Sequence, residues 1–305
     1  MQTTGNTILI TGGGTGIGEA LAHRFHDLGN TVIIAGRRIE TLEKAIGDRP
    51  NIHALTLDMD DAASVAAFAE KLVTDFPSVN VLFNSAGIMR MEGPLDKFRD
   101  LSDAEASITS NLLGPIRVTN ALIEHLGRQP NAVIVNISSG LAFVPLVIAP
   151  TYSAIKAAIH SYTESLRAVL KGKIEVIELV PPAVQTDLTP GQKTNERFMP
   201  LDTFADQVIA LFQQTPTPRE ILVEGVDFMR NAEAEDRFDD TLAAINPSSS
   251  RGAKTEPRLR KAPKPRASYS GLRSCLRGGR SVQKRRLPPI AVLLPLGPHH
   301  SGEMS

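Results

Sequence analysis

Short runs of apolar, often β-branched residues alternate along the chain with longer segments in which apolar residues recur every three or four positions. The runs are TILI (7–10), TVIIA (31–35), IHAL (52–55), VNVLF (79–83), AVIVNI (132–137), IEVIELV (174–180) and EILV (220–223). Runs that are apolar almost throughout are typical of strands in a parallel sheet that is covered on both faces. We therefore interpret each run as a buried strand.

Helical periodicity fills the segments between these runs, as the crossover connections of parallel strands require. The predicted helices span 19–28, 40–46, 62–75, 103–126, 152–170 and 202–214, and Ser102 with Glu105 has the spacing of a capping box before the fourth. This alternation predicts an α/β fold, a doubly wound Rossmann fold with a parallel sheet of about seven strands.

The pattern ends near Asn246, and the composition changes there. Residues 248–305 are rich in Pro, Ser, Gly and Arg and hold 13 basic and 2 acidic residues, a net charge of +11 in a chain that is neutral overall. Such a segment buries too little apolar surface to offset the entropy of ordering. We expect one folded domain over 1–247 and a disordered basic tail over 248–305. The tail, with KRR at 284–286, is more simply a solvated charge run than a nucleic-acid-binding segment.

Cysteine content and hydropathy bear on the compartment. The chain has one cysteine, Cys275, so disulfides cannot hold the fold, which suits a reducing cytosol. The N-terminus, MQTTGN, lacks the pattern of a signal peptide, and no apolar run approaches the roughly 18 residues of a membrane helix. We expect a cytoplasmic protein with no membrane partner, and we predict no metal site.

A glycine cluster, TGGGTGIG at 11–18, lies between the first predicted strand and the first predicted helix. It does not match G-x-G-x-x-G, and Glu19 stands where the Walker pattern needs a lysine. Gly12 permits a sharp turn, and Gly16 and Gly18 let backbone N–H groups approach a pyrophosphate at the helix N-terminus. A ligand-free glycine turn is the alternative, but the spacing and position favour a phosphate loop.

The spacing TGxxxGxG resembles the cofactor loop of the short-chain dehydrogenase/reductase superfamily, in its non-extended branch. Other motifs of the chain resemble that superfamily in the same order. Asp58 and Met59 match the position that contacts adenine, and NSAG at 84–87 is similar to the family's NNAG. The resemblance implies that the following residues also lie at the cofactor: Thr15, Ile17, Asn84, Ala86 and Gly87.

The end of the second predicted strand reads AGRR at 35–38 and bears on the choice of dinucleotide. NAD-specific sheets place a carboxylate here for the ribose hydroxyls, and this strand end has none. Arginine suits bidentate phosphate contacts. By resemblance, Arg37 would contact the 2′-phosphate with help from Arg38 or Thr15. We therefore expect NADP as the cofactor in preference to NAD.

Tyr152 is the one tyrosine with a lysine four residues on, Lys156. Positions i and i+4 share a helix face, so the phenol and the ammonium lie side by side. A nearby positive charge favours the phenolate and lowers the pKa of the phenol. We expect Tyr152 to be a general acid and base, and the resemblance implies that Lys156 also holds the cofactor's ribose.

Ser139 follows the strand at 132–137, at the sheet edge where open parallel sheets place their sites. Its hydroxyl could hydrogen-bond a substrate carbonyl; Ser138 competes but is one residue too close to Tyr152 for the family spacing. Asn111, in SNLLG, matches a family asparagine that positions a water linked to the lysine. An asparagine that merely bends or caps its helix is the alternative.

VPPAVQTDL at 180–188 matches the family loop P-G-x-V-x-T, with Pro182 in place of the glycine. The resemblance implies that Val184 and Thr186, with Pro182, contact the nicotinamide. The double proline, together with GLAFVPLVIAPTYSAIKAAIHSYTESLR, is similar to the branch of oxidoreductases named for the lipoteichoic-acid D-alanylation operon. In that branch the double proline is usual.

The resemblance implies an NADP(H)-dependent oxidoreductase that transfers a hydride between nicotinamide C4 and a carbonyl or secondary alcohol. A cofactor-binding sensor or scaffold without turnover is the alternative, which the intact Ser139, Tyr152 and Lys156 disfavour. Substrate choice is predicted to lie in 141–149 and 188–200, whose apolar residues favour a substrate with a hydrophobic portion. By family analogy we expect a homodimer or homotetramer.

Overall fold

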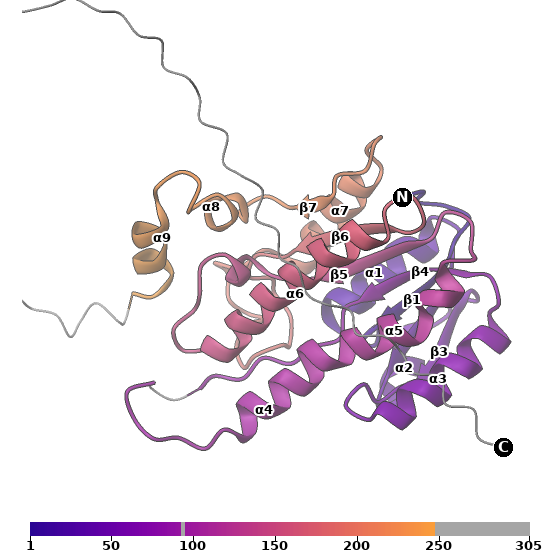
Figure 1. Ribbon diagram of the computed structural model, residues 1–305, viewed down its shortest axis with the longest axis horizontal. Helices are drawn as coiled ribbons and strands as arrows, with labels where there is room; N and C mark the ends of the chain where they lie inside the picture. Colours follow the sequence, from indigo (N-terminus) through magenta and orange to yellow (C-terminus); the bar gives the residue numbers. More distant parts are fainter. Residues whose placement is uncertain (93–94, 248–305) are drawn as a thin grey trace, which may run out of the picture. The chain divides into compact units, whose positions relative to one another are not determined.

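Seven parallel strands form one sheet in the order β3-β2-β1-β4-β5-β6-β7 (Figure 1). The computed structural model describes residues 1–92 and 95–247. The strands are β1 (Thr7–Thr11), β2 (Thr31–Gly36), β3 (Ile52–Thr56), β4 (Val79–Asn84), β5 (Val133–Ile137), β6 (Glu175–Val180) and β7 (Glu220–Leu222). The strand order reverses between β1 and β4, and ligands of open α/β sheets bind at such a switch point, outside the carboxyl ends of the strands. The predicted doubly wound sheet is confirmed.

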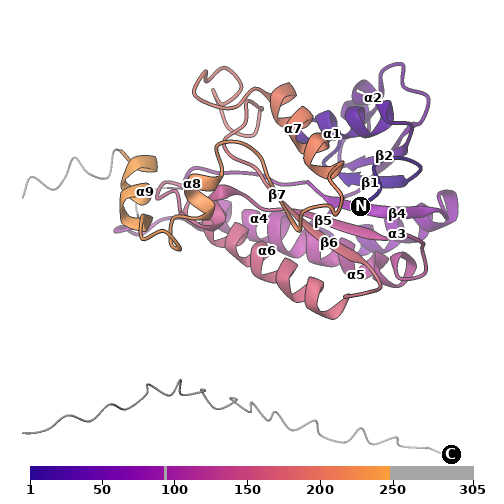
Figure 2. The same cartoon turned by 90° about the horizontal axis from the view of Figure 1, so that it is seen from above.

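Helices cover both faces of the sheet (Figure 2). One layer holds α1 (Gly16–Asp27), α2 (Ile39–Ile46) and α7 (Leu201–Phe212), and the other holds α3 (Ala62–Asp75), α4 (Ser102–Ile108), α5 (Gly114–Leu126) and α6 (Pro150–Val169). Every predicted helix is present, with ends displaced by a few residues. Among the described residues, no helix is long and apolar enough to cross a membrane.

The strands are apolar on both faces because each face has its own core. Ile8 and Ile10 pack toward α1, α2 and α7, whereas Leu9 packs toward α3 and α5. In the first core, the rings of Phe25 and Phe83 lie with centroids 5.2 Å apart. Burial of one such side chain contributes roughly 1.5–3 kcal/mol, so both cores hold the strand ends in place.

The sequence predicts one continuous helix over 103–126, but the structure interrupts it. A π-helical segment, Thr109–Leu113, separates α4 from α5. Pro115 lies four residues after Asn111 and has no N–H, so the Asn111 carbonyl cannot make the regular α-helical bond. π-bulges of this kind are frequent at functional sites.

The expected capping box before this helix is wrong. Ser102 is the first residue of α4 and caps nothing with its side chain. Its backbone N–H and its hydroxyl instead donate to the carboxylate of Asp100, at 3.1 and 2.7 Å. The S-x-x-E spacing therefore begins one residue inside the helix, where no capping interaction forms.

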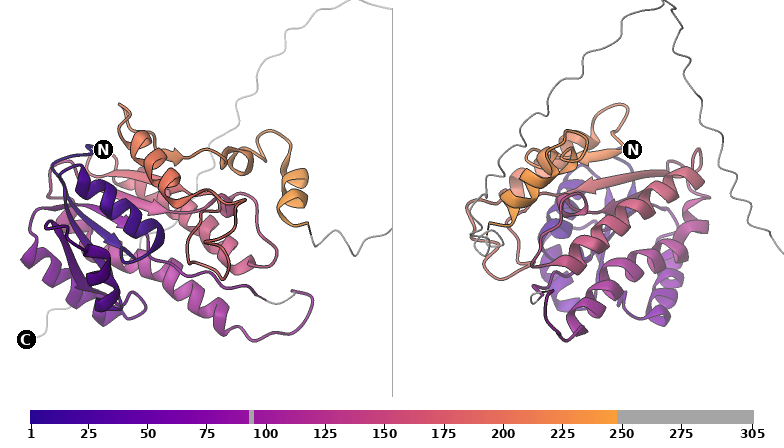
Figure 3. Two further views of the ribbon diagram at one scale, coloured as in Figure 1. Left: turned by 180° about the vertical axis from the view of Figure 1, so that it is seen from behind. Right: turned by 60° about the vertical axis from the view of Figure 1, so that its left-hand side comes forward.

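Two short helices follow β7, namely α8 (Asp227–Arg230) and α9 (Phe238–Ile245) (Figure 3). The sequence analysis did not predict them. They contribute to a small third core with Val144 and Val180. The side chain of Asn246, just after α9, bonds the backbone of Pro145 and Val147. The segment 141–149 is thus fastened to the C-terminal part of the domain. The predicted disordered tail over 248–305 lies outside the described residues.

Candidate active site

An open cavity of about 440 Å³ lies at the carboxyl ends of the central strands. It is lined by nearly all the residues that the sequence singled out: Gly12, Thr15, Gly16, Ile17, Gly18, Arg37, Arg38, Asp58, Met59, Ala86, Gly87, Ser139, Tyr152, Lys156, Pro182, Val184 and Thr186. Asn84 and Asn111 do not line it. Residues that are far apart in sequence therefore share one site, as the topology of the sheet requires.

The glycine loop is packed too closely for side chains. Gly12 has φ +69°, and a Cβ there would lie 2.7 Å from the Cα of Ala86. A Cβ at Gly18 would lie 2.4 Å from the carbonyl oxygen of Gly12. Gly16 also has a positive φ, +57°. The loop brings β1, β4 and the start of α1 together and leaves backbone facing the cavity, which fits a pyrophosphate.

Two exposed arginines stand at the end of β2. Arg37 and Arg38 line the cavity, and Arg38 precedes the first residue of α2, so a helix N-terminus opens beside them. Arg37 lies 3.8 Å from the carboxylate of Asp60, which sequence reasoning did not single out. Two cations, a helix N-terminus and a glycine cradle together fit a phosphorylated dinucleotide.

Tyr152 and Lys156 lie side by side on α6, as their spacing predicted. The ammonium of Lys156 is 5.4 Å from the centroid of the Tyr152 ring and donates to the carbonyl of Ile137 at 2.8 Å. Burial lowers the pKa of Lys156 to about 8, an effect that the charge of Glu178 partly offsets. The ammonium is therefore held at the end of β5 but is easily deprotonated.

Burial raises the pKa of the Tyr152 phenol above its usual value. The expectation that Lys156 would lower this pKa is not met, because desolvation penalises the phenolate and dominates here. Tyr152 is consequently protonated at neutral pH. That state suits a group that donates a proton to a developing alkoxide.

The two adjacent serines have different surroundings. Ser138 is buried, and its hydroxyl donates to the carboxylate of Glu178. Ser139 is half-buried at the cavity, and its hydroxyl oxygen accepts from the backbone N–H of Leu141 at 3.1 Å, which leaves its proton available. This geometry favours Ser139 over Ser138 as the group that contacts a substrate.

The two candidate asparagines are held inside the protein. The amide of Asn84 donates to Thr119 and Asn136, and its carbonyl oxygen is buried without a partner in the described structure. The Asn84 side chain therefore points between strands and helices, and the assignment of this residue to the cofactor stays a prediction. Asn111 bonds the backbone N–H and carbonyl of Ile88 at 2.8 and 2.6 Å. Its side chain thus fixes the loop after β4.

The segment 141–149 does not surround the cavity as expected. Val144 is fully buried in the third core, and Leu141 and Phe143 pack against it. Packing with residues of α8 and α9 explains the apolar character of Leu141, Phe143 and Val144, whereas Val147 and Ile148 are exposed. From the segment 188–200, Leu188 and Gln192 do line the cavity. The amide of Gln192 donates to Thr186 and Val184, which ties the segment to the loop after β6.

Several site residues had no signal in the sequence. Ser85, Ile88, Arg90 and Ser110 line the cavity because they neighbour recognised positions. Glu92 is a different case: its buried carboxylate accepts from the backbone N–H and the hydroxyl of Thr151, at 2.8 and 2.7 Å. It thereby satisfies the N-terminus of α6 directly before Tyr152, and no local spacing reveals this long-range contact.

Comparison with known proteins identifies the family to which this chain belongs. Residues 6–197 match the family described as short chain dehydrogenase, so the chain belongs to the short-chain dehydrogenase family. It is similar to the oxidoreductase DltE of Bacillus subtilis (strain 168), with 37% identity over 243 residues, 77% of this chain and 95% of that protein. The predicted resemblance to this branch is confirmed.

Solved structures of short-chain dehydrogenases have the same fold as this chain. A short-chain dehydrogenase from Burkholderia cenocepacia in complex with NADP has a TM-score of 0.69 and 26% identity, covering 80% of this chain and 98% of its own. A 3-ketoacyl-(acyl-carrier-protein) reductase from Brucella melitensis, complexed with NADH, has a TM-score of 0.65 and 27% identity, covering 72% and 96%. The fold is thus that of the short-chain dehydrogenases, and this chain is an oxidoreductase of that family.

Proposed function

We propose that this chain is an NADP(H)-dependent oxidoreductase that interconverts a carbonyl compound and a secondary alcohol. One observation carries the proposal: a single cavity joins the glycine loop and two exposed arginines to Ser139, Tyr152 and Lys156. The first group suits binding of a phosphorylated dinucleotide, and the second suits proton transfer beside it.

The end of β2 supports NADP over NAD. Arg37 and Arg38 offer positive charge where an NAD-specific chain places a carboxylate. Asp60 pairs with Arg37 only loosely, at 3.8 Å, so a 2′-phosphate could take its place as the closer partner. Because similar structures bind NADP in one case and NADH in another, the preference depends on these residues of this chain.

NADPH, when bound, supplies the hydride for the carbonyl carbon. Ser139 would donate a hydrogen bond to the substrate oxygen, which orients and polarises the carbonyl group, and would keep its own proton. Tyr152, protonated because burial raises its pKa, gives its proton to that oxygen as negative charge develops. Lys156 holds the ribose hydroxyls of the cofactor, and its positive charge stabilises the phenolate that remains. In the oxidative direction Tyr152 takes the proton back.

The helix break supports a route for re-protonation. The carbonyl of Asn111 is released from the regular helix because Pro115 has no N–H to offer it. The side chain of Asn111 is engaged by Ile88, so its backbone carbonyl is the group of this residue that would hold a water on the path to Lys156.

We also propose a homodimer or homotetramer in the cytoplasm. Apolar side chains are exposed between the end of β4 and α5: Leu95, Phe98, Leu101, Ile108 and Leu113. A second copy that covered them would remove this surface from water. The single cysteine supports a reducing compartment.

The test is depletion of NADPH with a panel of aldehydes and ketones that vary in charge and chain length. We expect turnover of at least one compound and weaker use of NADH. Tight NADPH binding with no turnover across the panel would instead favour the sensor or scaffold function.

A further inference from the structure

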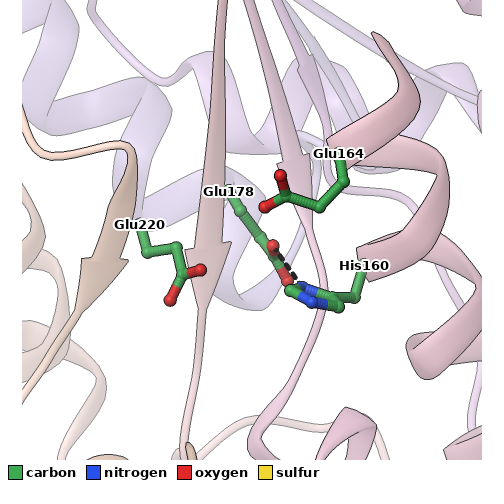
Figure 4. A group of neighbouring side chains, drawn as sticks. All are labelled: His160, Glu164, Glu178 and Glu220. Atoms are coloured by element: carbon green, nitrogen blue, oxygen red, sulfur yellow. Dashed lines mark hydrogen bonds and ion pairs between the residues drawn. The ribbon is translucent and has the colours of Figure 1, made fainter. Parts of the chain in front are cut away.

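A row of polar side chains runs along α6 away from the cavity. Tyr152, Lys156, His160 and Glu164 recur at every fourth position and so lie on one face of the helix. Figure 4 shows His160 and Glu164 projecting from α6 toward Glu178, which comes from a neighbouring strand. The proposed catalytic pair is thus continuous with a cluster of ionisable groups that the mechanism above does not use.

Glu178 is the unusual member of this cluster. Its side chain is wholly buried on β6, between core residues Ile177 and Leu179. A buried carboxylate is costly unless it is paired and hydrogen-bonded. Both of its oxygens are engaged, one by the hydroxyl of Ser138 and the other by Nδ1 of His160 at 2.8 Å. An apolar residue would satisfy the packing of this strand more simply, so the carboxylate calls for another explanation.

The carboxylate of Glu178 is connected to both halves of the catalytic set. Ile137, whose carbonyl holds Lys156, pairs with Leu179, and Asn136 pairs with Glu178. The negative charge of Glu178 opposes the burial that lowers the pKa of Lys156. Ser138, which Glu178 holds, directly precedes Ser139.

A metal ion does not explain the cluster. Ligand atoms of His160, Glu164, Glu178 and Glu220 lie within 4.8 Å of one another. However, Glu164 pairs with Arg167 and Arg219, and Glu220 pairs with Arg230. Three arginines therefore occupy two of the three carboxylates, and a cation would have to displace them.

We infer that Glu178 is a positioning residue for the proposed reaction: its hydrogen bond with Ser138 anchors the strand end that carries Ser139, and its buried charge acts on the ammonium of Lys156. The inference rests on the proposed function for the role of Lys156 at the cofactor. The groups that face this pair are Tyr152, His160 and Glu164 from α6, Glu220 from β7 and Arg230 from α8. Among them, Glu178 is the carboxylate whose charge acts on Lys156.

The experiment replaces the charge without changing the shape. Glu178→Gln in the full chain is compared with wild type, with Glu178→Asp, and with the control Glu220→Gln from the same cluster. The free energy of unfolding and the NADPH dissociation constant are each measured across pH. In wild type both should change as Lys156 loses its proton near pH 8. In Glu178→Gln both changes should move to lower pH by about one unit.

Glu178→Asp keeps the charge, so the pH at which the unfolding free energy and the NADPH dissociation constant change should move by less than in Glu178→Gln. Glu220→Gln should leave that pH unchanged. The inference is overturned if neither Glu178 variant moves the change in unfolding free energy, or if Glu220→Gln moves it equally. If that change moves while NADPH affinity does not depend on pH, the action of Glu178 on Lys156 stands. In that case the proposed contact of Lys156 with the cofactor is wrong.

Discussion

The cofactor end of the cavity is made largely of backbone, whereas the catalytic end is made of buried polar side chains. At the cofactor end, Gly12 and Gly18 approach other backbone atoms so closely that no Cβ fits. At the catalytic end, burial raises the pKa of Tyr152 and lowers the pKa of Lys156, and the carbonyl of Ile137 on β5 holds Lys156. We therefore expect substitutions at the cofactor end to weaken NADPH binding, and substitutions at the catalytic end to slow the reaction.

The largest effect is expected at Tyr152, at the catalytic end. Tyr152→Phe removes the proton donor, so kcat should fall by at least about 100-fold, or about 2.7 kcal/mol of barrier. NADPH affinity, measured by fluorescence titration, should stay within about threefold because the cofactor end is unchanged. A variant that keeps more than about a tenth of wild-type activity contradicts the assigned role.

The two serines provide a matched pair. Ser139→Ala should lower kcat/KM by about 100-fold, since a hydroxyl aimed at the substrate oxygen is lost. Ser138→Ala removes only the bond to Glu178 and should cost less than about tenfold. Equal losses in steady-state kinetics of the two variants would remove the distinction drawn from their burial.

At the cofactor end, the double variant Arg37→Ala, Arg38→Ala should discriminate between dinucleotides. Loss of charge-assisted bonds to a 2′-phosphate should raise the dissociation constant of NADPH by about 10- to 100-fold. The value for NADH should change little, because that cofactor lacks the phosphate. Calorimetric titration of both cofactors checks the result, and parallel weakening of both would show that the arginines do not read the phosphate.

Close backbone packing at the same end can be tested with two glycines. Gly12→Ala places a methyl group against Ala86 and should weaken NADPH binding by about tenfold. Gly172→Ala is the control, because Gly172 also has a positive φ, +81°, but no atom lies within 4 Å of its Cβ position. Both variants should lose some thermal stability. Loss of NADPH affinity in the control as well would mean that backbone strain, not the contact with Ala86, is responsible.

The smallest effect is a pH dependence set at the catalytic end. Burial lowers the pKa of Lys156 to about 8 in the folded chain. In the unfolded chain the pKa of this lysine is about 10.4, so the folded chain releases the proton at a lower pH. The free energy of unfolding should therefore rise with pH between about pH 8 and about pH 9.5, by about 1–2 kcal/mol. Urea unfolding at several pH values measures it. Lys156→Met should abolish this rise, and an unchanged rise would exclude Lys156 as its source.

Local spacing was a good guide wherever one short segment forms the feature. The apolar runs predicted the strands of the described sheet, and the spacing of Gly12, Gly16 and Gly18 predicted a phosphate loop, whose glycines do line the cavity. Local spacing does not show contacts with partners that are distant in the sequence. Asn84 matches a cofactor motif, yet its amide is engaged by Thr119 and Asn136 inside the sheet. In the segment 141–149, Leu141, Phe143 and Val144 share a core with residues of α8 and α9, which no periodicity in the sequence predicts.

The sequence by itself determined the parallel sheet, the glycine turn after the first strand and the pairing of Tyr152 with Lys156, because each depends on the residue spacing within one short segment. Only the tertiary structure decided the pKa values of Tyr152 and Lys156, and the burial of Glu178 on β6, next to the strand that ends at Lys156's partner Ile137. The physical reason is that pKa values follow from desolvation and from charges on neighbouring strands. Both arise only when α6 and β6 are packed together and water is excluded from between them.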